Sequence, residues 1–177
     1  MIRALSNRLR RFRRGTDGNT SIEFVIIFPL FMTFLLFSLE LSFITLRHAM
    51  LERGLDLTVR QIRLGYATPP NHPTIKGMVC EYAQLGDTCL ENVRLEMKPI
   101  DPRAYAGLDE VADCTDRAEP TKPVKQFTPG QRNQLMILRA CLKYDPLLPT
   151  AVLGKALSKD ASGQSAVISI SAFVNEP

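Results

Sequence analysis

The sequence has few residues of the kinds that build catalytic or metal sites. Only two of its 177 residues are histidines, and His48 and His72 each lack a clustered partner. Its four cysteines do not show the close spacing of zinc-binding pairs. It contains no nucleophile elbow, phosphate-binding loop or pair of catalytic carboxylates. We therefore expect no catalytic residues, no metal site and no cofactor, and the sequence does not predict an enzyme.

Acidic residues are absent before Asp17, whereas the same stretch is rich in arginine. The arginines are Arg3, Arg8, Arg10, Arg11, Arg13 and Arg14. They account for the net charge of +4 and the pI near 9.0, because the chain beyond residue 18 is close to neutral. The basic character belongs to a short arm, so we expect no nucleic-acid partner.

A long apolar run follows this basic arm. No charged residue occurs from Phe24 to Leu39, and apart from Glu40 the run continues to Leu46. The segment Ile22–Leu46 is long enough for one membrane pass, which needs roughly 20 residues. Arginines flank it on one side only, and positive flanks stay in the cytoplasm. We predict a single-pass inner-membrane protein with a cytoplasmic N-terminus and a periplasmic C-terminal domain.

Two other readings of the run fit less well. A cleaved secretory signal has a shorter apolar stretch and a small-residue cleavage site, and the sequence Glu40-Leu41-Ser42-Phe43 is not such a site. A buried core helix would not explain arginines on one side only. A membrane helix therefore remains the prediction.

The helix is predicted to continue beyond the membrane. Apolar residues recur at helical spacing, at Leu51, Leu55, Val59 and Ile62. Gly65 and the Pro69-Pro70 pair are stop signals. We expect one helix over residues 19–65, transmembrane over about 22–46, with a local kink or loosened turn at Pro29. The apolar stripe would face a small domain.

Residues 66–177 are predicted to form that extracytoplasmic domain, after a cytoplasmic leader over residues 1–18. Alternating apolar residues indicate three strands, at 92–98, 134–144 and 166–174. The Pro-rich and charged segment 101–130 reads as a long loop, 148–157 as a helical turn and 162–165 as a turn. The predicted fold class is α+β: a long N-terminal helix packed on a small antiparallel sheet.

The cysteines all fall in this outer domain. An even number in an oxidising compartment indicates two disulfides among Cys80, Cys89, Cys114 and Cys141. Three pairings are open. Loop length favours Cys80 with Cys89, and Cys114 with Cys141, which would fix the long loop to a strand. A zinc site is the rival reading.

Glu23 lies at the start of the apolar run, where a carboxylate needs a partner or a task. In one reading it completes a capping box with Thr20 and satisfies amides of the first helical turn. In the other, the chain is cut after Gly18. Glu23 would then be the fifth residue of the mature chain, and its carboxylate would pair with the Asn19 amine of a neighbouring subunit.

These residues resemble the class III signal of prepilins and pseudopilins. More narrowly, residues 18–29 resemble the opening of TadE-like proteins, minor pseudopilins of tight-adherence (Flp-type) pili. The matching positions are Gly18, Glu23, Phe24 and Pro29. Residues 138–147 and 167–177 resemble that family's C-terminal tail. TadG-like proteins share the opening, but the chain after Leu64 is too short for their large von Willebrand-type domain.

The resemblance implies a pseudopilin-like fold and a role in assembly. It implies processing at Gly18 and Asn19 by a prepilin peptidase, and assembly through Glu23, Phe24 and Pro29. The expected partners are that peptidase, other pilin and pseudopilin subunits, the pilus assembly machinery and membrane lipid. The expected function is a minor pseudopilin of a type IVb/Flp system for adherence and secretion-type machinery. The alternative is an uncleaved, signal-anchored periplasmic adaptor or envelope protein.

Overall fold

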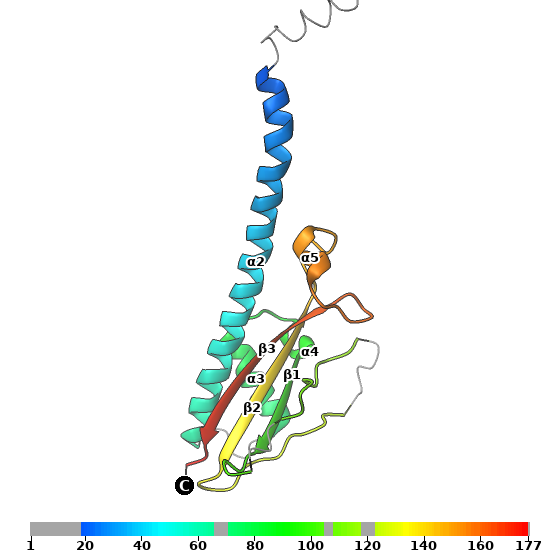
Figure 1. Ribbon diagram of the computed structural model, residues 1–177. Coiled ribbons are helices and arrows are strands. Elements are labelled where there is room, and N and C mark those ends of the chain that lie inside the picture. The colour runs from blue at the N-terminus through cyan, green and yellow to red at the C-terminus, as the bar shows by residue number, and fades with distance from the viewer. Residues whose placement is uncertain (1–18, 66–70, 105–107, 118–122, 177) are drawn as a thin grey trace, which may run out of the picture. The chain divides into compact units, whose positions relative to one another are not determined.

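The computed structural model describes residues 19–65, 71–104, 108–117 and 123–176, which form helices and one small sheet (Figure 1). The elements are α2 (Asn19–Arg63), α3 (His72–Ala83), α4 (Cys89–Asn92), β1 (Val93–Pro99), β2 (Leu135–Tyr144), α5 (Val152–Ala156) and β3 (Ser165–Val174). The chain divides into two compact units, residues 1–38 and residues 39–177. The α+β class with a long N-terminal helix and a three-strand antiparallel sheet is confirmed.

Helix α2 runs without interruption through Pro29. Proline cannot donate its helical hydrogen bond. The Thr33 hydroxyl donates to the Pro29 carbonyl at 2.7 Å, as a side chain one turn later commonly does. The helix ends at Arg63, and Gly65 follows with a φ of 76° and donates its N–H to the Ile62 carbonyl at 3.0 Å. Glycine suits this left-handed position, which is why it marks the helix end.

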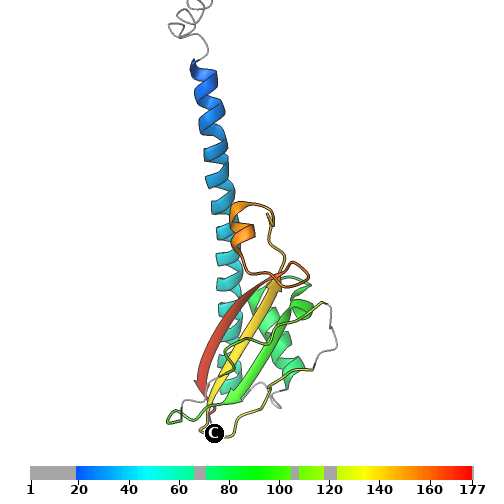
Figure 2. The same cartoon turned by 45° about the vertical axis from the view of Figure 1, so that its right-hand side comes forward.

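The sheet has the order β1-β2-β3, with both pairs antiparallel. Leu142 of β2 lies opposite Val93 of β1 and Val167 of β3, so the three apolar side chains share one face. Figure 2 shows this sheet beside the C-terminal half of α2. The three strands lie within a residue or so of their predicted positions, because alternation fixes which residues face the core.

The core lies between this sheet face, α2 and α3. Its α2 members are the predicted stripe of Leu51, Leu55, Val59 and Ile62, all buried. Ile75 and Val79 of α3 are also fully buried. They cover a side of the core for which the sequence analysis predicted no element. The helix therefore contributes one face of the folded domain.

Helix α3 was not predicted from the sequence. Asn71 is the N-cap: its side-chain oxygen accepts the Thr74 N–H at 2.9 Å. Proline is favoured in the first helical turn, where its missing N–H costs nothing. These residues therefore start the helix. His72 is half-buried, and its ring meets the Phe127 ring edge-on.

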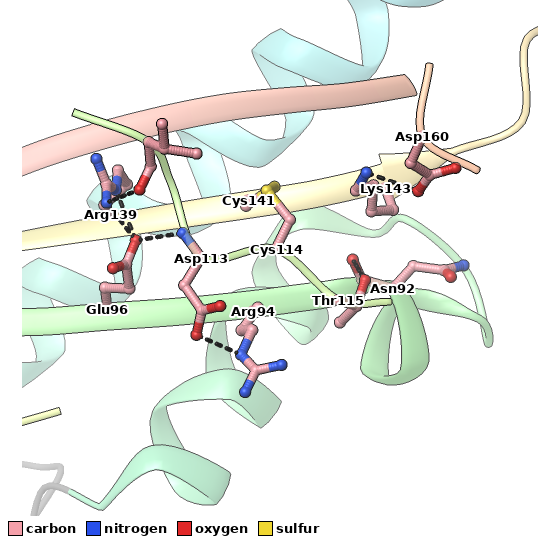
Figure 3. The surroundings of a disulfide bond; sticks show 11 residues. Asn92, Arg94, Glu96, Asp113, Cys114, Thr115, Arg139, Cys141, Lys143 and Asp160 are labelled. Atoms are coloured by element: carbon pink, nitrogen blue, oxygen red, sulfur yellow. Dashed lines mark hydrogen bonds and ion pairs between the residues drawn. A yellow bond between two sulfur atoms is a disulfide. The ribbon is translucent and has the colours of Figure 1, made fainter. Parts of the chain in front are cut away.

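The disulfides join Cys80 to Cys89 and Cys114 to Cys141, the pairing that loop length favours. The first links α3 to α4. The second attaches the loop after β1 to the middle strand of the sheet (Figure 3). Each bond closes a segment of the chain, and cross-linking restricts the unfolded chain.

A buried ionic network reinforces the second disulfide on the outer face of the sheet (Figure 3). Arg139 of β2 pairs with Glu96 of β1 at 2.6 Å, and Arg94 pairs with Asp113 of the loop at 2.9 Å. The Asp113 N–H donates to Glu96 at 3.0 Å, which connects the two pairs. Buried charges are tolerated when they are paired in this way. The network and the disulfide therefore hold the long loop against the sheet.

The close approach of α2 to α3 depends on Gly54. A Cβ at this position would lie 2.6 Å from the Ala83 Cβ and 2.7 Å from the Val79 carbonyl oxygen. We expect Gly54→Ala to lower the free energy of unfolding by about 1–3 kcal/mol, because backbone atoms would have to move. Denaturant unfolding measures this. Gly77→Ala on α3 is the control: its Cβ meets nothing within 4 Å, and it should stabilise by up to about 1 kcal/mol. Equal effects of the two variants would contradict this packing.

Candidate functional site

The apolar N-terminal part of α2 has the properties of a membrane anchor. Its most apolar 18-residue window has a mean hydropathy of 2.3, and none of that window is buried inside the described structure. Exposed side chains there include Phe24, Val25, Ile26, Phe31 and Phe34. Apolar side chains on every side of a helix are stable in lipid or against other apolar helices. This single helix is therefore a candidate membrane anchor.

The residues assigned to assembly lie at the start of this helix. Glu23 is exposed, and it makes no hydrogen bond or ion pair with any described residue. Phe24 stacks on Phe28, with ring centroids 4.9 Å apart. Thr20 lies inside the helix, so it does not serve as the N-cap that a capping box requires. The Glu23 carboxylate is thus available to a partner.

The processing junction lies partly outside the described residues. Gly18 precedes the described chain, and Asn19 is the first residue of α2 as described. Pro29 lies about three helical turns beyond Asn19 and is exposed. The structure brings Glu23, Phe24 and Pro29 onto one continuous helix.

A second acidic residue, Glu40, has a role that sequence reasoning missed. It directly follows the uncharged run, yet its side chain is only 1% exposed. Its two carboxylate oxygens accept the consecutive backbone N–H groups of Leu147 and Leu148, at 3.1 and 2.9 Å. A carboxylate can be buried when it accepts hydrogen bonds of this kind. Glu40 therefore fixes the loop after β2 to α2.

Two further residues of α2 attach the helix to the sheet. The Arg47 guanidinium lies 4.9 Å over the ring of Tyr144, the last residue of β2. His48 Nε2 donates to the Ile168 carbonyl of the edge strand β3 at 3.2 Å. Burial raises the pKa of the Tyr144 phenol; Arg47 opposes that rise and Glu40 adds to it. The phenol therefore stays neutral, and its ring serves as a platform for Arg47.

A surface cleft of about 570 Å³ lies near α3, α4 and the loop after β1. It is lined in part by His72, Lys76, Glu91, Arg94 and Arg117. Burial and nearby cations lower the pKa of both His72 and Lys76, so the imidazole is neutral near pH 7. The buried Nε2 atom of His72 has no hydrogen-bond partner among the described residues. The cleft therefore does not pair this nitrogen with a nucleophile.

Comparison with family models finds a similarity in the N-terminal helix. Residues 18–60 match the TadE-like protein family. The match includes Gly18, Glu23, Phe24 and Pro29, so the resemblance of this opening is confirmed. It also includes Glu40, but not the C-terminal segments 138–147 and 167–177, whose resemblance stays a prediction. The TadE-like segment, residues 18–60, thus joins the anchor to part of the core stripe. No curated protein and no solved structure matches the chain.

The hydrogen bonds of Glu40 predict the effect of removing its charge. In Glu40→Gln the side-chain oxygen can accept one N–H, while its NH₂ group faces the other. We expect a loss of about 1–3 kcal/mol, because a buried donor stays unsatisfied. The segment that contains Lys155 should then be cut faster by trypsin, as peptide mapping would show. Glu52→Gln, at an exposed position of α2, is the control. Identical cleavage of both variants at Lys155 would contradict the role of Glu40.

Proposed function

We propose that this protein is a minor pseudopilin of a tight-adherence (type IVb/Flp) pilus system, which takes part in pilus assembly. The observation that carries the proposal is the match of residues 18–60 to the TadE-like family, which suggests involvement in such systems. The exposed apolar surface of α2 supports it, since pilus subunits assemble by packing apolar helices. In this proposal the protein acts through contacts and is not an enzyme.

The physical role of Glu23 follows from its surroundings. A carboxylate within an apolar helix costs up to roughly 3 kcal/mol in lipid. Among the described residues Glu23 has no partner that would offset this cost. We propose that prepilin peptidase cuts after Gly18 and that the new Asn19 amine of a neighbouring subunit pairs with Glu23. The pair would set the register between packed helices, because the attraction between the two charges is strong in a low-dielectric region and weakens as they are moved apart.

The arginine-rich leader supports an orientation with the N-terminus in the cytoplasm. The disulfide-linked domain would then lie in the periplasm, where disulfides persist. Other pilin and pseudopilin subunits and the assembly machinery would be its partners, with lipid around α2 before assembly. The alternative is a signal-anchored adaptor or envelope protein that keeps its leader.

Processing separates these two functions. We predict that the native chain in the membrane fraction begins at Asn19, as N-terminal sequencing would show. Gly18→Leu should retain residues 1–18, because a bulky side chain would block the peptidase cleavage site. Gly77→Leu, where an added Cβ meets nothing within 4 Å, tests for a general effect of replacing glycine and should be processed normally. A wild-type chain that begins with its leader would support the uncleaved anchor instead.

A pilus assembly assay tests the role of the Glu23 carboxylate. We expect Glu23→Ala to insert into the membrane as well as the wild type, since the change removes a charge from an apolar helix. Its incorporation into pili should fall by at least tenfold, measured by quantifying pili and the subunit within them. Glu52→Ala, at another exposed acidic position of α2, should assemble normally. Normal pili with Glu23→Ala would count against the proposed ion pair.

A further inference from the structure

We infer that the segment Asp145–Leu157, here called the α5 loop, lies on the lipid surface of the membrane. Figures 1 and 2 both show this loop beside α2, beyond the end of the sheet. The inferred contacts with lipid are made by Leu147 and Val152. The inference depends on α2 being the membrane anchor, and it holds whether or not the leader is removed.

The first argument is the position at which the loop is attached. The buried Glu40 carboxylate accepts the N–H groups of Leu147 and Leu148, so the loop is fixed beside that residue. Glu40 follows Leu39, the last residue of the uncharged run. If α2 leaves the hydrocarbon of the bilayer where its uncharged run ends, the loop lies at that same depth.

The second argument is exposed apolar surface. Leu147 is 53% exposed and Val152 is 65% exposed. On α2, Leu39, Leu41 and Phe43 beside Glu40 are also exposed. The polar residues exposed among them, Ser38 and Ser42, are small. Covering exposed apolar side chains is worth about 25 cal/mol per Å² of apolar area. Exposed apolar side chains therefore lie both on residues 39–43 of α2 and on the loop that Glu40 holds.

The third argument is that the backbone of the loop is closely packed against itself. Gly154 of α5 is buried, and a Cβ there would overlap the Leu148 carbonyl oxygen. The Ala151 N–H also donates to the Leu148 carbonyl at 3.1 Å. Because the inside of the loop is filled by its own backbone, Leu147 and Val152 are held facing outward.

The fourth argument is charge. The acidic residues Asp145 and Asp160 already pair with Arg117 and Lys143, at 2.8 and 2.7 Å. Lys155 is exposed and makes no ion pair with a described residue. The charges of Asp145 and Lys155 within the loop sum to zero, but Asp145 is paired with Arg117. The unpaired charge that the loop presents beside its apolar side chains is therefore the cation of Lys155. This combination suits anionic lipid headgroups over acyl chains.

A bound lipid surface explains these features together, so we assign the loop to lipid and not to a protein partner. The assignment shortens the predicted membrane span. The hydrocarbon part of α2 would run from Thr20 to Leu39, which is about 30 Å at 1.5 Å per residue and equals the hydrocarbon thickness of a bilayer. From Glu40 onward, α2 would belong to the headgroup region and the folded domain.

Fluorescent labels in proteoliposomes test this inference. All four cysteines form disulfides, so an introduced cysteine is the one free thiol. We would label Leu147→Cys and Val152→Cys in the full chain with an environment-sensitive dye, in phosphatidylcholine vesicles containing phosphatidylglycerol. Quenchers carried on lipid tails near the headgroup should reduce both signals at least threefold more than at the controls.

The controls match residue type and exposure at the far end of the domain. Leu64→Cys replaces a leucine that is 56% exposed, about 35 Å along α2 from Glu40. Val174→Cys replaces a valine that is 47% exposed at the end of β3. Phe34→Cys reports insertion of the anchor and should be quenched from within the lipid.

Two results would overturn the inference. One is quenching at Phe34 with no excess at Leu147 and Val152 over the controls, which would leave the loop free for a protein partner. The other is no quenching at Phe34, because the chain would then lack the anchor on which the inference depends. Processing of the leader does not enter this test, so its outcome is independent of the proposed pilus role.

Discussion

The hydrogen bonding of one buried carboxylate, just after the apolar run, determines where the loop after β2 is held on α2. Glu40 accepts two backbone N–H groups from a loop more than 100 residues later in the sequence. Without these bonds its burial would cost several kcal/mol. Just beyond it, Arg47 and His48 attach the same helix to Tyr144 and to the edge strand. The helix and the sheet are therefore connected by polar contacts at one end and by the apolar core along the rest.

The same helix serves two environments by changing its pattern. Before Glu40 apolar side chains point in all directions, which suits lipid or packed helices. Further along, from Leu51 to Ile62, the buried apolar side chains form one stripe, which the sheet and α3 cover. The loops beyond the core have little apolar surface to bury. Two disulfides and the ionic network centred on Glu96 and Asp113 hold them instead.

Sequence patterns were sufficient where the physics is local or periodic. Alternation located the three strands, and helical spacing located the stripe that packs on them. Helix α3 was missed because Pro73 starts a helix as readily as it ends one, and its buried positions are few. Glu40 was missed because its partners are backbone N–H groups, and backbone groups leave no trace in the sequence. The partner expected for Glu23 lies on another chain, so one folded subunit cannot display it.

The most direct measurement of this account is hydrogen exchange at single amides of the full chain in detergent micelles. If Glu40 holds the loop, the amides of Leu147 and Leu148 should exchange slowly, at rates like those of strand β2. The amide of Val152, in the same loop but at the start of α5, should exchange faster. Equally fast exchange at all three amides would show that the loop is not held by the carboxylate, and the account of how the domain joins its anchor would be wrong.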